Sequence, residues 1–335
     1  MRISEFGGEL AVIDLIAARY GVRDTDGLPV GIGDDAALIT ISKRLQLIVT
    51  TDLLVEGTHF RRDIIDAYSL GWKSVAANIS DIAAMAGRPT YTFPSIAFDD
   101  VDVEFLQGFC EGMSHCARAY GSVIAGGDTN ISKDCWAVNV TQLGEVETGR
   151  ATLRSGARAG DVVMITGTLG DSRAGLELLL KVGLEKARSA HPQTVEAHLR
   201  PRPRVSEAAA AAGTGLVHAM MDVSDGLAAD LPKLCSASRV GALVHANAAP
   251  VSEALRAAGE ELHMDAEWLA MQGGEDYELL FTVSEGDVGS VSRAVIDQTA
   301  TPVAAIGVIT SNTDVLVQRP DGMRVPLRGG WEHFI

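Results

Sequence analysis

Residues 31–37, Gly-Ile-Gly-Asp-Asp-Ala-Ala, constrain the fold of this chain more than any other stretch. Apolar residues lead into and out of them, which predicts a strand, a tight turn and a second strand. Glycines let the backbone bend sharply and approach a ligand. Two adjacent carboxylates repel each other unless a cation or water relieves the repulsion. A solvated turn is the simplest interpretation, and a cation site is the alternative.

The same combination of carboxylates, hydroxyls and glycines recurs along the chain. We expect residues 49–52, Val-Thr-Thr-Asp, to end the next strand, and residues 78–81, Asn-Ile-Ser-Asp, to lie in a helix. Residues 126–129, Gly-Gly-Asp-Thr, and residues 222–226, Asp-Val-Ser-Asp-Gly, each follow a short apolar run. Such side chains suit a hard cation, which takes oxygen ligands. The recurrence therefore favours a cation site assembled from distant segments.

Composition and charge limit the class of protein. A length of 335 residues suggests two domains, and abundant alanine and glycine predict closely packed helices. The formal net charge of −16 argues against nucleic acid or an anionic membrane as a partner, because phosphates repel such a surface. No apolar run reaches the length of a membrane span. The cysteines lack zinc-site spacing and indicate reduced thiols in a cytoplasmic protein, at Cys110, Cys116, Cys135 and Cys235.

The apolar periodicity predicts two α/β units, as domains 1–148 and 149–335. The first combines helices over 9–20, 66–86 and 102–119 with strands over 45–49, 91–98, 122–125 and 136–145. The second combines strands over 161–166, 220–223, 241–246, 277–283, 303–309 and 314–318 with helices over 225–237, 265–271 and 285–298.

Two stretches leave alternatives open. On the helix over 66–86, Ser74, Asn78, Asp81 and Met85 fall on one face, which is either functional or a solvent-facing stripe. Residues 167–172, Gly-Thr-Leu-Gly-Asp-Ser, open a helix and form either an anion site or ordinary strand–helix punctuation.

Eight motifs in order resemble those of the thiamine-monophosphate kinase family. They are Gly-Ile-Gly-Asp-Asp-Ala (31–36), Thr-Thr-Asp-x-x-Val-Glu-Gly-x-His-Phe (50–60), Asn-x-Ser-Asp-x-Ala-Ala-Met (78–85), Gly-Gly-Asp-Thr (126–129), Arg-Ser-Gly-Ala (154–157), Thr-Gly-x-Leu-Gly-Asp-Ser (166–172), Asp-Val-Ser-Asp-Gly-Leu (222–227) and Gly-Gly-Glu-Asp-Tyr-Glu-Leu (273–279). The resemblance extends to Gly-Trp-Glu-His-Phe at 330–334 and covers almost the whole chain. Ala86 departs from the family, which usually has glycine there, and we expect no chemical consequence.

The resemblance implies an α/β (α+β) class and the two-domain PurM-like fold of the aminoimidazole-ribonucleotide-synthetase superfamily. There, the N-terminal α/β domain forms a β-barrel with its twin in a homodimer, and the C-terminal domain has a central mixed sheet. The implied reaction is ATP plus thiamine monophosphate giving ADP plus thiamine diphosphate, with several Mg²⁺ ions, as the last step of thiamine diphosphate biosynthesis.

The resemblance also implies roles for individual residues. ATP would contact Gly127, Asp128, Arg154 and Ser224, and the acceptor would contact His59. We expect Glu275 to face the thiazolium or aminopyrimidine of the acceptor and Trp331 to stack on it. Without the family, His59 and Trp331 would be interpreted as structural residues.

Metal ions are needed because the motifs contain few cations. The chain has six lysines, of which only Lys73 lies in a motif region, so Mg²⁺ must neutralise the substrate phosphates. The candidate ligands are Asp35, Thr50, Thr51, Asp52, Asp81, Asp128, Asp222 and Asp225. We interpret Asp34 as a support for these ligands or a cap of the turn. No side chain is needed as a general base, because a phosphate monoester with a second pKa of about 6 is already a nucleophile near neutral pH.

Three other functions fit the same residues. A related enzyme of the superfamily would make a different phosphorylated product. A magnesium-dependent phosphohydrolase would release free phosphate. A non-catalytic module would bind nucleotide and metal without turnover.

Overall fold

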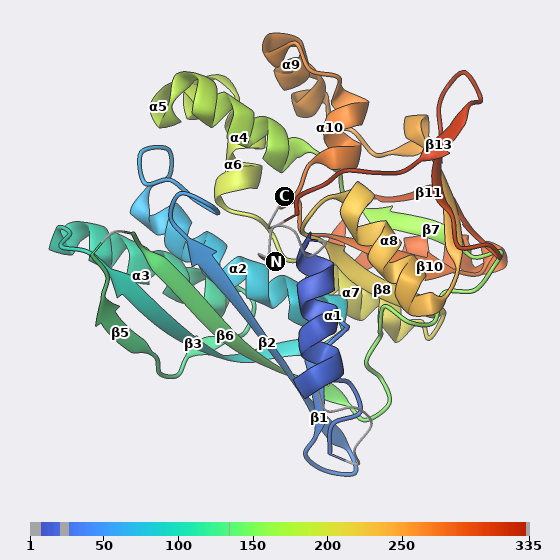
Figure 1. Cartoon of the computed structure of the whole chain (residues 1–335), viewed down its shortest axis with the longest axis horizontal. Coiled ribbons are helices and arrows are strands. Elements are labelled where there is room, and N and C mark those ends of the chain that lie inside the picture. The colour runs from blue at the N-terminus through green and yellow to red at the C-terminus, as the bar shows by residue number, and fades with distance from the viewer. Residues whose placement is uncertain (1–7, 21–26, 134, 333–335) are drawn as a thin grey trace.

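The computed structural model describes residues 8–20, 27–133 and 135–332, and contains two β-sheets flanked by helices (Figure 1). The first sheet lies within residues 37–147 and the second within residues 162–326. A boundary at residue 148 falls in the connection between the two sheets. The expected two-domain α/β architecture with mixed sheets is confirmed, and helix α1 (Gly8–Tyr20) precedes the first sheet.

The first sheet has one packed and one open face. Its strands are β1 (Ala37–Thr40), β2 (Leu45–Val55), β6 (Ala137–Glu147), β3 (Arg88–Phe98) and β4 (Val123–Ile124) in spatial order, and β5 (Asp128–Ile131) also pairs with β3. The first four are antiparallel neighbours, whereas β4 and β5 run parallel to β3. Burial alternates along β6, as expected where only one face of a sheet is covered.

Helices α2 (Ala67–Ala84) and α3 (Val103–Ala119) pack tightly together beside this sheet (Figure 1). Asp66 caps α2, because its carboxylate accepts a hydrogen bond from the backbone N–H of Ser69 at 2.8 Å. A Cβ on Gly71 would lie 2.0 Å from the carbonyl oxygen of Phe109, so the two backbones touch there. The close helix packing expected from the composition is therefore present.

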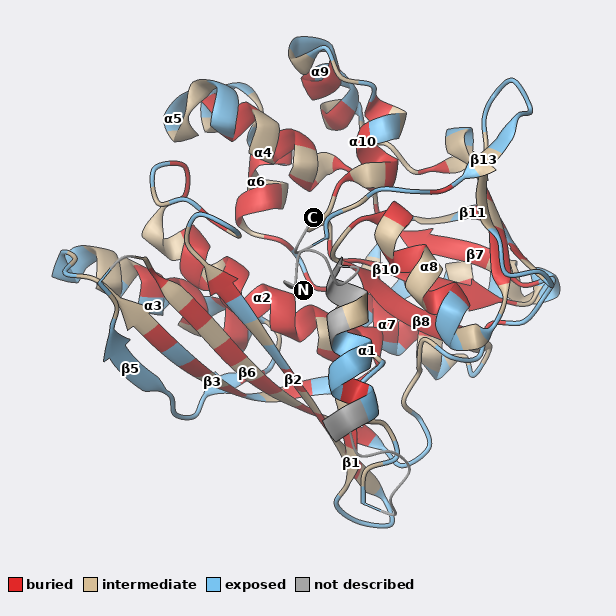
Figure 2. Cartoon of the chain, viewed as in Figure 1, coloured by how far each residue is buried: buried red, intermediate tan, exposed pale blue. Residues whose placement is uncertain are grey.

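The second sheet has seven strands against six in the first, and its residues are more completely buried. Its strands are, in spatial order, β13 (Arg324–Pro326), β12 (Val315–Gln318), β9 (Gly241–His245), β11 (Val303–Thr310), β7 (Val162–Thr166), β10 (Glu278–Val283) and β8 (Val217–Val223). Only β12 and β9 are parallel neighbours. Every residue of the central strand β10 is buried, and Figure 2 shows how the buried residues concentrate in the strands and in α2.

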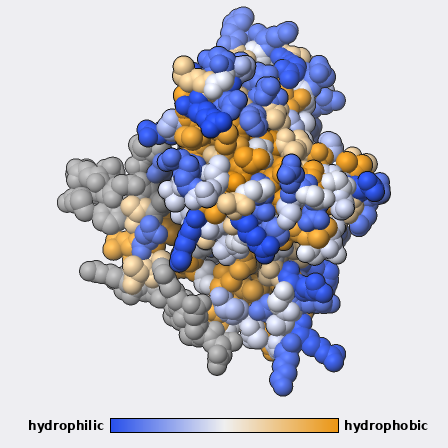
Figure 3. Space-filling view, turned by 90° about the vertical axis from the view of Figure 1, so that its right-hand side faces the viewer, coloured by the Kyte–Doolittle hydropathy of each residue, from blue (hydrophilic) through white to orange (hydrophobic). Residues whose placement is uncertain are grey.

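Eight α-helices accompany the second sheet. With that sheet they form what we call the second part of the described chain, and the first sheet with α2 and α3 forms the first part. The eight helices are α4 (Asp171–Val182), α5 (Leu184–Ala190), α6 (Pro192–Leu199), α7 (Val205–Gly213), α8 (Leu227–Ser238), α9 (Glu253–Leu262), α10 (Ala266–Gln272) and α11 (Val288–Thr299). In the space-filling view of the molecule's right-hand side, apolar areas lie between hydrophilic side chains (Figure 3). Among the described residues, no helix is both long enough and apolar enough to cross a membrane.

Two expectations from the sequence need correction. Strand β2 continues to Val55, so residues 49–52 lie inside a strand, where β6 pairs with all 11 residues of β2. The polar face of α2 is not a solvent-facing stripe, because Ser74, Asn78 and Met85 are fully buried. Within the described part of a single chain, neither sheet closes into a barrel.

Candidate active site

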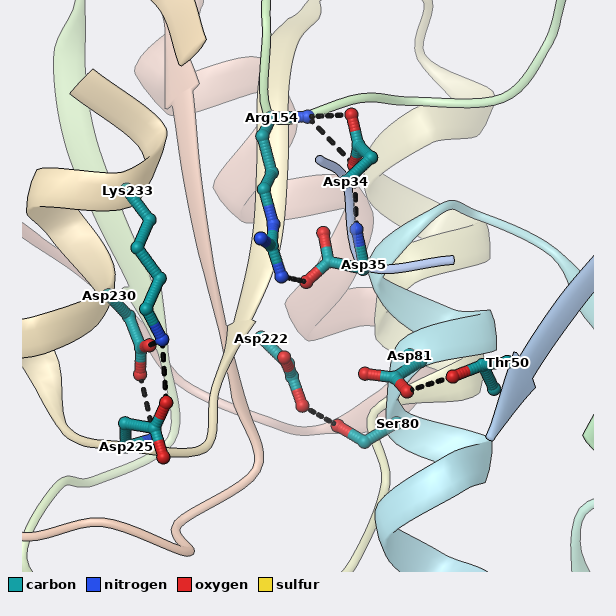
Figure 4. Close-up of polar contacts among 10 residues, drawn as sticks. All are labelled: Asp34, Asp35, Thr50, Ser80, Asp81, Arg154, Asp222, Asp225, Asp230 and Lys233. Carbon is teal, nitrogen blue, oxygen red and sulfur yellow. Dashed lines mark hydrogen bonds and ion pairs between the residues drawn. The ribbon is translucent and has the colours of Figure 1, made fainter. Parts of the chain in front are cut away.

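Three carboxylates from distant segments meet between the two sheets (Figure 4). Asp35 comes from the glycine turn before β1, Asp81 from α2 and Asp222 from β8. One oxygen atom of each lies within 4.8 Å of the others. The sequence predicted all three as metal ligands, and the fold brings them together.

Each member of this carboxylate cluster is held by a neighbour. Thr50 donates a hydrogen bond to Asp81 at 2.5 Å, and Ser80 donates one to Asp222 at 2.6 Å. The guanidinium of Arg154 lies 2.7 Å from the Oδ1 atom of Asp35. The Oδ2 atom of Asp35 is buried and has no hydrogen-bond partner. A buried carboxylate oxygen without a donor is the kind of group that a cation satisfies.

Burial and mutual repulsion make this cluster electrostatically unfavourable without a cation. Burial, followed by the neighbouring carboxylates, raises the pKa of Asp81 and that of Asp222 well above the ordinary value. Burial and the charge of Asp35 raise the pKa of Asp34 to about 7. Asp34 also accepts hydrogen bonds from the backbone N–H groups of Asp35 and Arg154, at 3.0 Å and 3.2 Å. These bonds match the supporting role expected for Asp34.

A second acidic group lies beside the cluster. Asp52 has a pKa raised to about 6 by burial and by the charge of Asp225. Lys233 forms ion pairs with Asp225 at 2.6 Å and with Asp230 at 2.9 Å (Figure 4). The sequence did not predict Lys233, which lies in α8 outside every motif.

A cavity of about 540 Å³ joins these acids to an apolar chamber. Its acidic end is lined by Asp52, Asp81, Asp222 and Asp225, with Thr51 and Ser224 beside them. The lining also includes the apolar side chains of Leu54, Phe60, Ile64, Leu176 and Leu180. The three residues predicted to contact the acceptor, His59, Glu275 and Trp331, line the same cavity.

Hydrogen bonds hold two of the predicted acceptor residues, His59 and Trp331. The Nδ1 atom of His59 accepts a hydrogen bond from the backbone N–H of Val55 at 3.0 Å. The side chain of Trp331 is 47% exposed, and its backbone N–H donates to the carbonyl oxygen of Asp225 at 2.8 Å. The end of the C-terminal motif, residues 333 and 334, lies outside the described residues.

Lys73 and His198 also line the cavity, and the sequence did not assign them a role. Lys73 lies 2.8 Å from Glu275, and His198 lies 3.4 Å from the same carboxylate. Burial would raise the pKa of Glu275, but the neighbouring groups, led by Lys73, together hold it below the ordinary value. A signal for Lys73 was present, because Lys73, Ala77 and Asp81 are spaced four residues apart on one helix face.

Gly127 and Asp128 are not brought to the cluster within this chain. Asp128 begins β5, is exposed and pairs with Ser95 of β3 at the outer edge of the first sheet. Strands β3 and β6 lie between β5 and β2, which carries Asp52.

The glycine-rich turn before α4 binds a side chain of the protein itself. Asp276 accepts hydrogen bonds from the backbone N–H groups of Gly170 and Ser172, at 2.6 Å and 3.2 Å. The carboxylate of Asp276 therefore occupies the helix N-terminus. This favours an ordinary turn between strand and helix over a phosphate site there.

Comparison with known proteins gives consistent results. The family model for the AIR synthase related protein, N-terminal domain, matches residues 33–146, and that for its C-terminal domain matches residues 158–318. The thiamine-monophosphate kinase of Escherichia coli (strain K12) is 37% identical over 336 residues, covering 98% of each chain. This chain belongs to the thiamine-monophosphate kinase family. The resemblance carried by the eight motifs is confirmed.

Solved structures similar to this chain extend the family assignment to three dimensions. A structure named AaThiL complexed with AMPPCP and TMP covers 99% of both chains, with a TM-score of 0.85 and 33% identity. The crystal structure of the thiamine-monophosphate kinase from Stenotrophomonas maltophilia K279a has a TM-score of 0.76 and 34% identity. It covers 93% of this chain and 96% of that chain.

Proposed function

We propose that this chain is an ATP-dependent kinase that converts thiamine monophosphate to thiamine diphosphate. The observation that carries the proposal is the single cavity that joins the carboxylate cluster to an apolar and aromatic chamber. An acceptor with a phosphate at one end and a flat cationic ring system at the other fits this division. The family relatives bear the name of this activity, and one similar structure is described as a complex with AMPPCP and TMP.

The carboxylate cluster is suited to hold Mg²⁺. Asp35, Asp81 and Asp222 supply oxygen atoms at short mutual distances, and the orphaned Oδ2 atom of Asp35 needs a positive partner. Asp52, Asp225, Thr50 and Thr51 are further ligand candidates at the same end of the cavity. Bound Mg²⁺ would neutralise the phosphate oxygens of both substrates and so favour their approach.

Of the four residues expected to contact ATP, only Ser224 and Arg154 lie at the carboxylate end of the cavity. Ser224 lines the cavity, and Arg154 reaches the cluster through Asp35. The Nε atom of Arg154 is buried and has no hydrogen-bond partner, so its fork retains a donor for a phosphate oxygen. Gly127 and Asp128, which lie away from the cluster within this chain, are assigned to the nucleotide set from the family alone.

The apolar chamber is suited to the thiamine part of the acceptor. Trp331 lines this cavity, and its ring would stack on a thiazolium cation, an interaction of about 0.5–2 kcal/mol. Glu275 adds a carboxylate with a lowered pKa to the same wall. Aromatic stacking and a negative group together favour a cationic ring over a neutral one.

The reaction needs no general base from the protein. The phosphate monoester of the acceptor is largely a dianion near neutral pH, so its oxygen can attack the γ-phosphorus directly and ADP leaves. His59 matches this scheme, because its Nδ1 atom already accepts the Val55 N–H and its other nitrogen then carries the proton as a donor. The protein's tasks are alignment of the phosphates and exclusion of water.

A homodimer is part of the proposal. The open face and outer edge of the first sheet carry exposed apolar side chains, including Leu53, Tyr91, Val123 and Ile131, the last of them 78% exposed. Pairing this face with the same face of a second copy would bury these side chains. The first sheets of the two copies would then close into the barrel that the family fold implies.

The decisive assay uses purified protein with ATP, Mg²⁺ and thiamine monophosphate, with unphosphorylated thiamine as the control acceptor. We expect ADP and thiamine diphosphate in equal amounts, and no product from thiamine. Free phosphate without thiamine diphosphate would identify a phosphohydrolase instead. Binding of ATP without turnover on any acceptor would identify a non-catalytic module.

A further inference from the structure

Lys73 is a buried charge at the wall of the cavity. Its side chain is 1% exposed, although it lies on α2 among alanines and other apolar residues. A buried ammonium is costly unless ion pairs and hydrogen bonds compensate it. The Nζ atom lies 2.8 Å from Glu275 and 3.3 Å from the Nε2 atom of His198. These partners belong to the second part of the chain, so Lys73 links the two parts across the cavity.

The contacts around Lys73 form a defined network. An ammonium can only donate hydrogen bonds, so the Nε2 atom of His198 accepts and the imidazole is neutral. Burial and the charge of Lys73 lower the pKa of His198 to about 3, which agrees with a neutral ring. The ring proton is then on Nδ1, which lies 3.2 Å from the hydroxyl of Ser172 and 3.4 Å from Glu275. Lys73 and His198 therefore approach different oxygen atoms of the Glu275 carboxylate.

The loop that carries Glu275 has strained backbone. Glu275 and Tyr277 have φ angles of +65° and +52°, in the left-handed region that non-glycine residues rarely adopt. Such a conformation persists only where the surroundings hold it. Within the second part of the chain, the backbone N–H of Glu275 donates to Ser224 at 2.6 Å and Asp276 binds the start of α4. Among the described residues, the ion pair of Lys73 with Glu275 ties this loop to the first part of the chain.

We propose that Lys73 is a positioning residue for the acceptor, because it fixes the Glu275 carboxylate at the cavity wall. This inference rests on the proposed function and assigns that site a residue outside the expected contact set. Lys73 acts through Glu275 and not on the transferred phosphate. Loss of Lys73 therefore weakens acceptor binding and leaves the ATP site and the chemical step nearly unchanged.

The test is a double-mutant cycle with Lys73→Met, Glu275→Gln and the double variant. We expect each single variant to raise KM for thiamine monophosphate about tenfold, with kcat and KM for ATP within roughly threefold of wild type. The double variant should resemble the worse single variant, because residues that act as one unit are not additive. Lys73→Arg should recover part of the loss, since it keeps the charge.

Arg188→Met is the matched control. Arg188 of α5 also links the second part to the start of α2, through Asp66 at 2.5 Å, and pairs with Glu196 of α6 at 3.0 Å, but it does not line the cavity. We expect its KM for the acceptor to stay within about twofold of wild type. An equal rise in both variants would show that any lost link between the two parts impairs the site, and would overturn the role of Lys73.

Other outcomes are equally decisive. Additive effects in the cycle, or a fall in kcat at unchanged acceptor KM, would show that Lys73 acts independently of Glu275. If Lys73→Met fails to fold, the double variant, which removes both charges, is compared with Glu275→Gln alone and should match it. Calorimetric binding of thiamine monophosphate without turnover separates this inference from the proposed function. Wild type that binds the acceptor without phosphorylating it would contradict the function alone, and Lys73→Met that binds as wild type does would contradict the inference.

Discussion

Asp35, Asp81 and Asp222 hold three carboxylates at distances that oppose each other's ionisation. Among the ion pairs of the described residues, only that of Arg154 places a cationic group against one of them. The cluster is therefore expected to depend on a bound cation for activity and to cost folding free energy without one.

Asp81→Asn tests this dependence at a single residue. Asparagine keeps an acceptor oxygen for Thr50 but removes one charge. We expect phosphoryl transfer to fall at least 10²-fold, because a position for Mg²⁺ is lost. The metal-free variant should melt higher, by roughly 2–4 °C for each kcal/mol of repulsion relieved. Asp14→Asn, an exposed change on α1, is the control for both assays. Normal turnover of Asp81→Asn at ordinary Mg²⁺ would remove Asp81 from the metal site.

Trp331→Ala tests the acceptor end of the cavity. Loss of a partly desolvated cation–π stack should weaken thiamine monophosphate binding by about 1–2 kcal/mol, which is roughly 5–30-fold. Calorimetry with each substrate separately measures the effect, and ATP affinity should change by less than about twofold. If ATP affinity falls as much as acceptor affinity, the tryptophan has only a structural role.

The sequence could identify residues by type and order but not by distance. Asp35, Asp81 and Asp222 were predicted together, because each lies in a family motif and carries a hard oxygen ligand. Asp128 met the same criteria and lies on an edge strand instead, since strand order is set by long-range pairing. The function of Lys73 depends on contacts to a loop about 200 residues later in the chain, and no local pattern encodes such contacts.

At the scale of elements, the backbone is strained where α2 ends, at Ala86. Ala86 and Gly87 donate to the carbonyl oxygens of Ala83 and Ile82, which is the Schellman arrangement. That arrangement needs a left-handed residue, and Ala86 has a φ of +57° where the family usually has glycine. The departure noted in the sequence is therefore one of backbone strain, and Asp81 on the preceding turn still joins the carboxylate cluster.

Ala86→Gly should stabilise the protein. Glycine relieves the left-handed strain, and we expect the free energy of unfolding to rise by about 0.5–1 kcal/mol. Chemical denaturation measures the change, and turnover should not alter. Ala209→Gly, an exposed position inside α7, should instead lower the free energy of unfolding by about 1 kcal/mol. Destabilisation by both changes would show that the α2 terminus is not strained.

At the scale of the whole molecule, the buried acids link stability to pH. Asp34 has a pKa of about 7 in the folded protein against 3.8 in the unfolded chain, and the pKa values of Asp81 and Asp222 are raised in the same direction. Between pH 4 and pH 7 the folded state therefore binds more protons than the unfolded state, so stability falls as pH rises. His198 acts in the opposite direction, but only below its unfolded pKa of 6.5.

Thermal unfolding at about pH 6.5 and pH 8 keeps the contribution of His198 small relative to that of the carboxylates. In EDTA, we expect a lower melting temperature at pH 8, where Asp34 has lost its proton and repels the neighbouring carboxylate of Asp35. With Mg²⁺, the gain in melting temperature should be larger at pH 8, because fewer protons compete with the ion for the carboxylates. A melting temperature that rises with pH in EDTA would contradict the unfavourable charge of the cluster.

The central claim for the whole site is that it aligns two phosphates and supplies no general base. The direct measurement is the single-turnover rate of His59→Asn at saturating ATP, Mg²⁺ and thiamine monophosphate. We expect that rate to stay within about tenfold of wild type while acceptor affinity falls, because His59 donates to the acceptor and removes no proton from it. A loss of about 10²–10⁴-fold at saturation would make His59 a general base and contradict the claim.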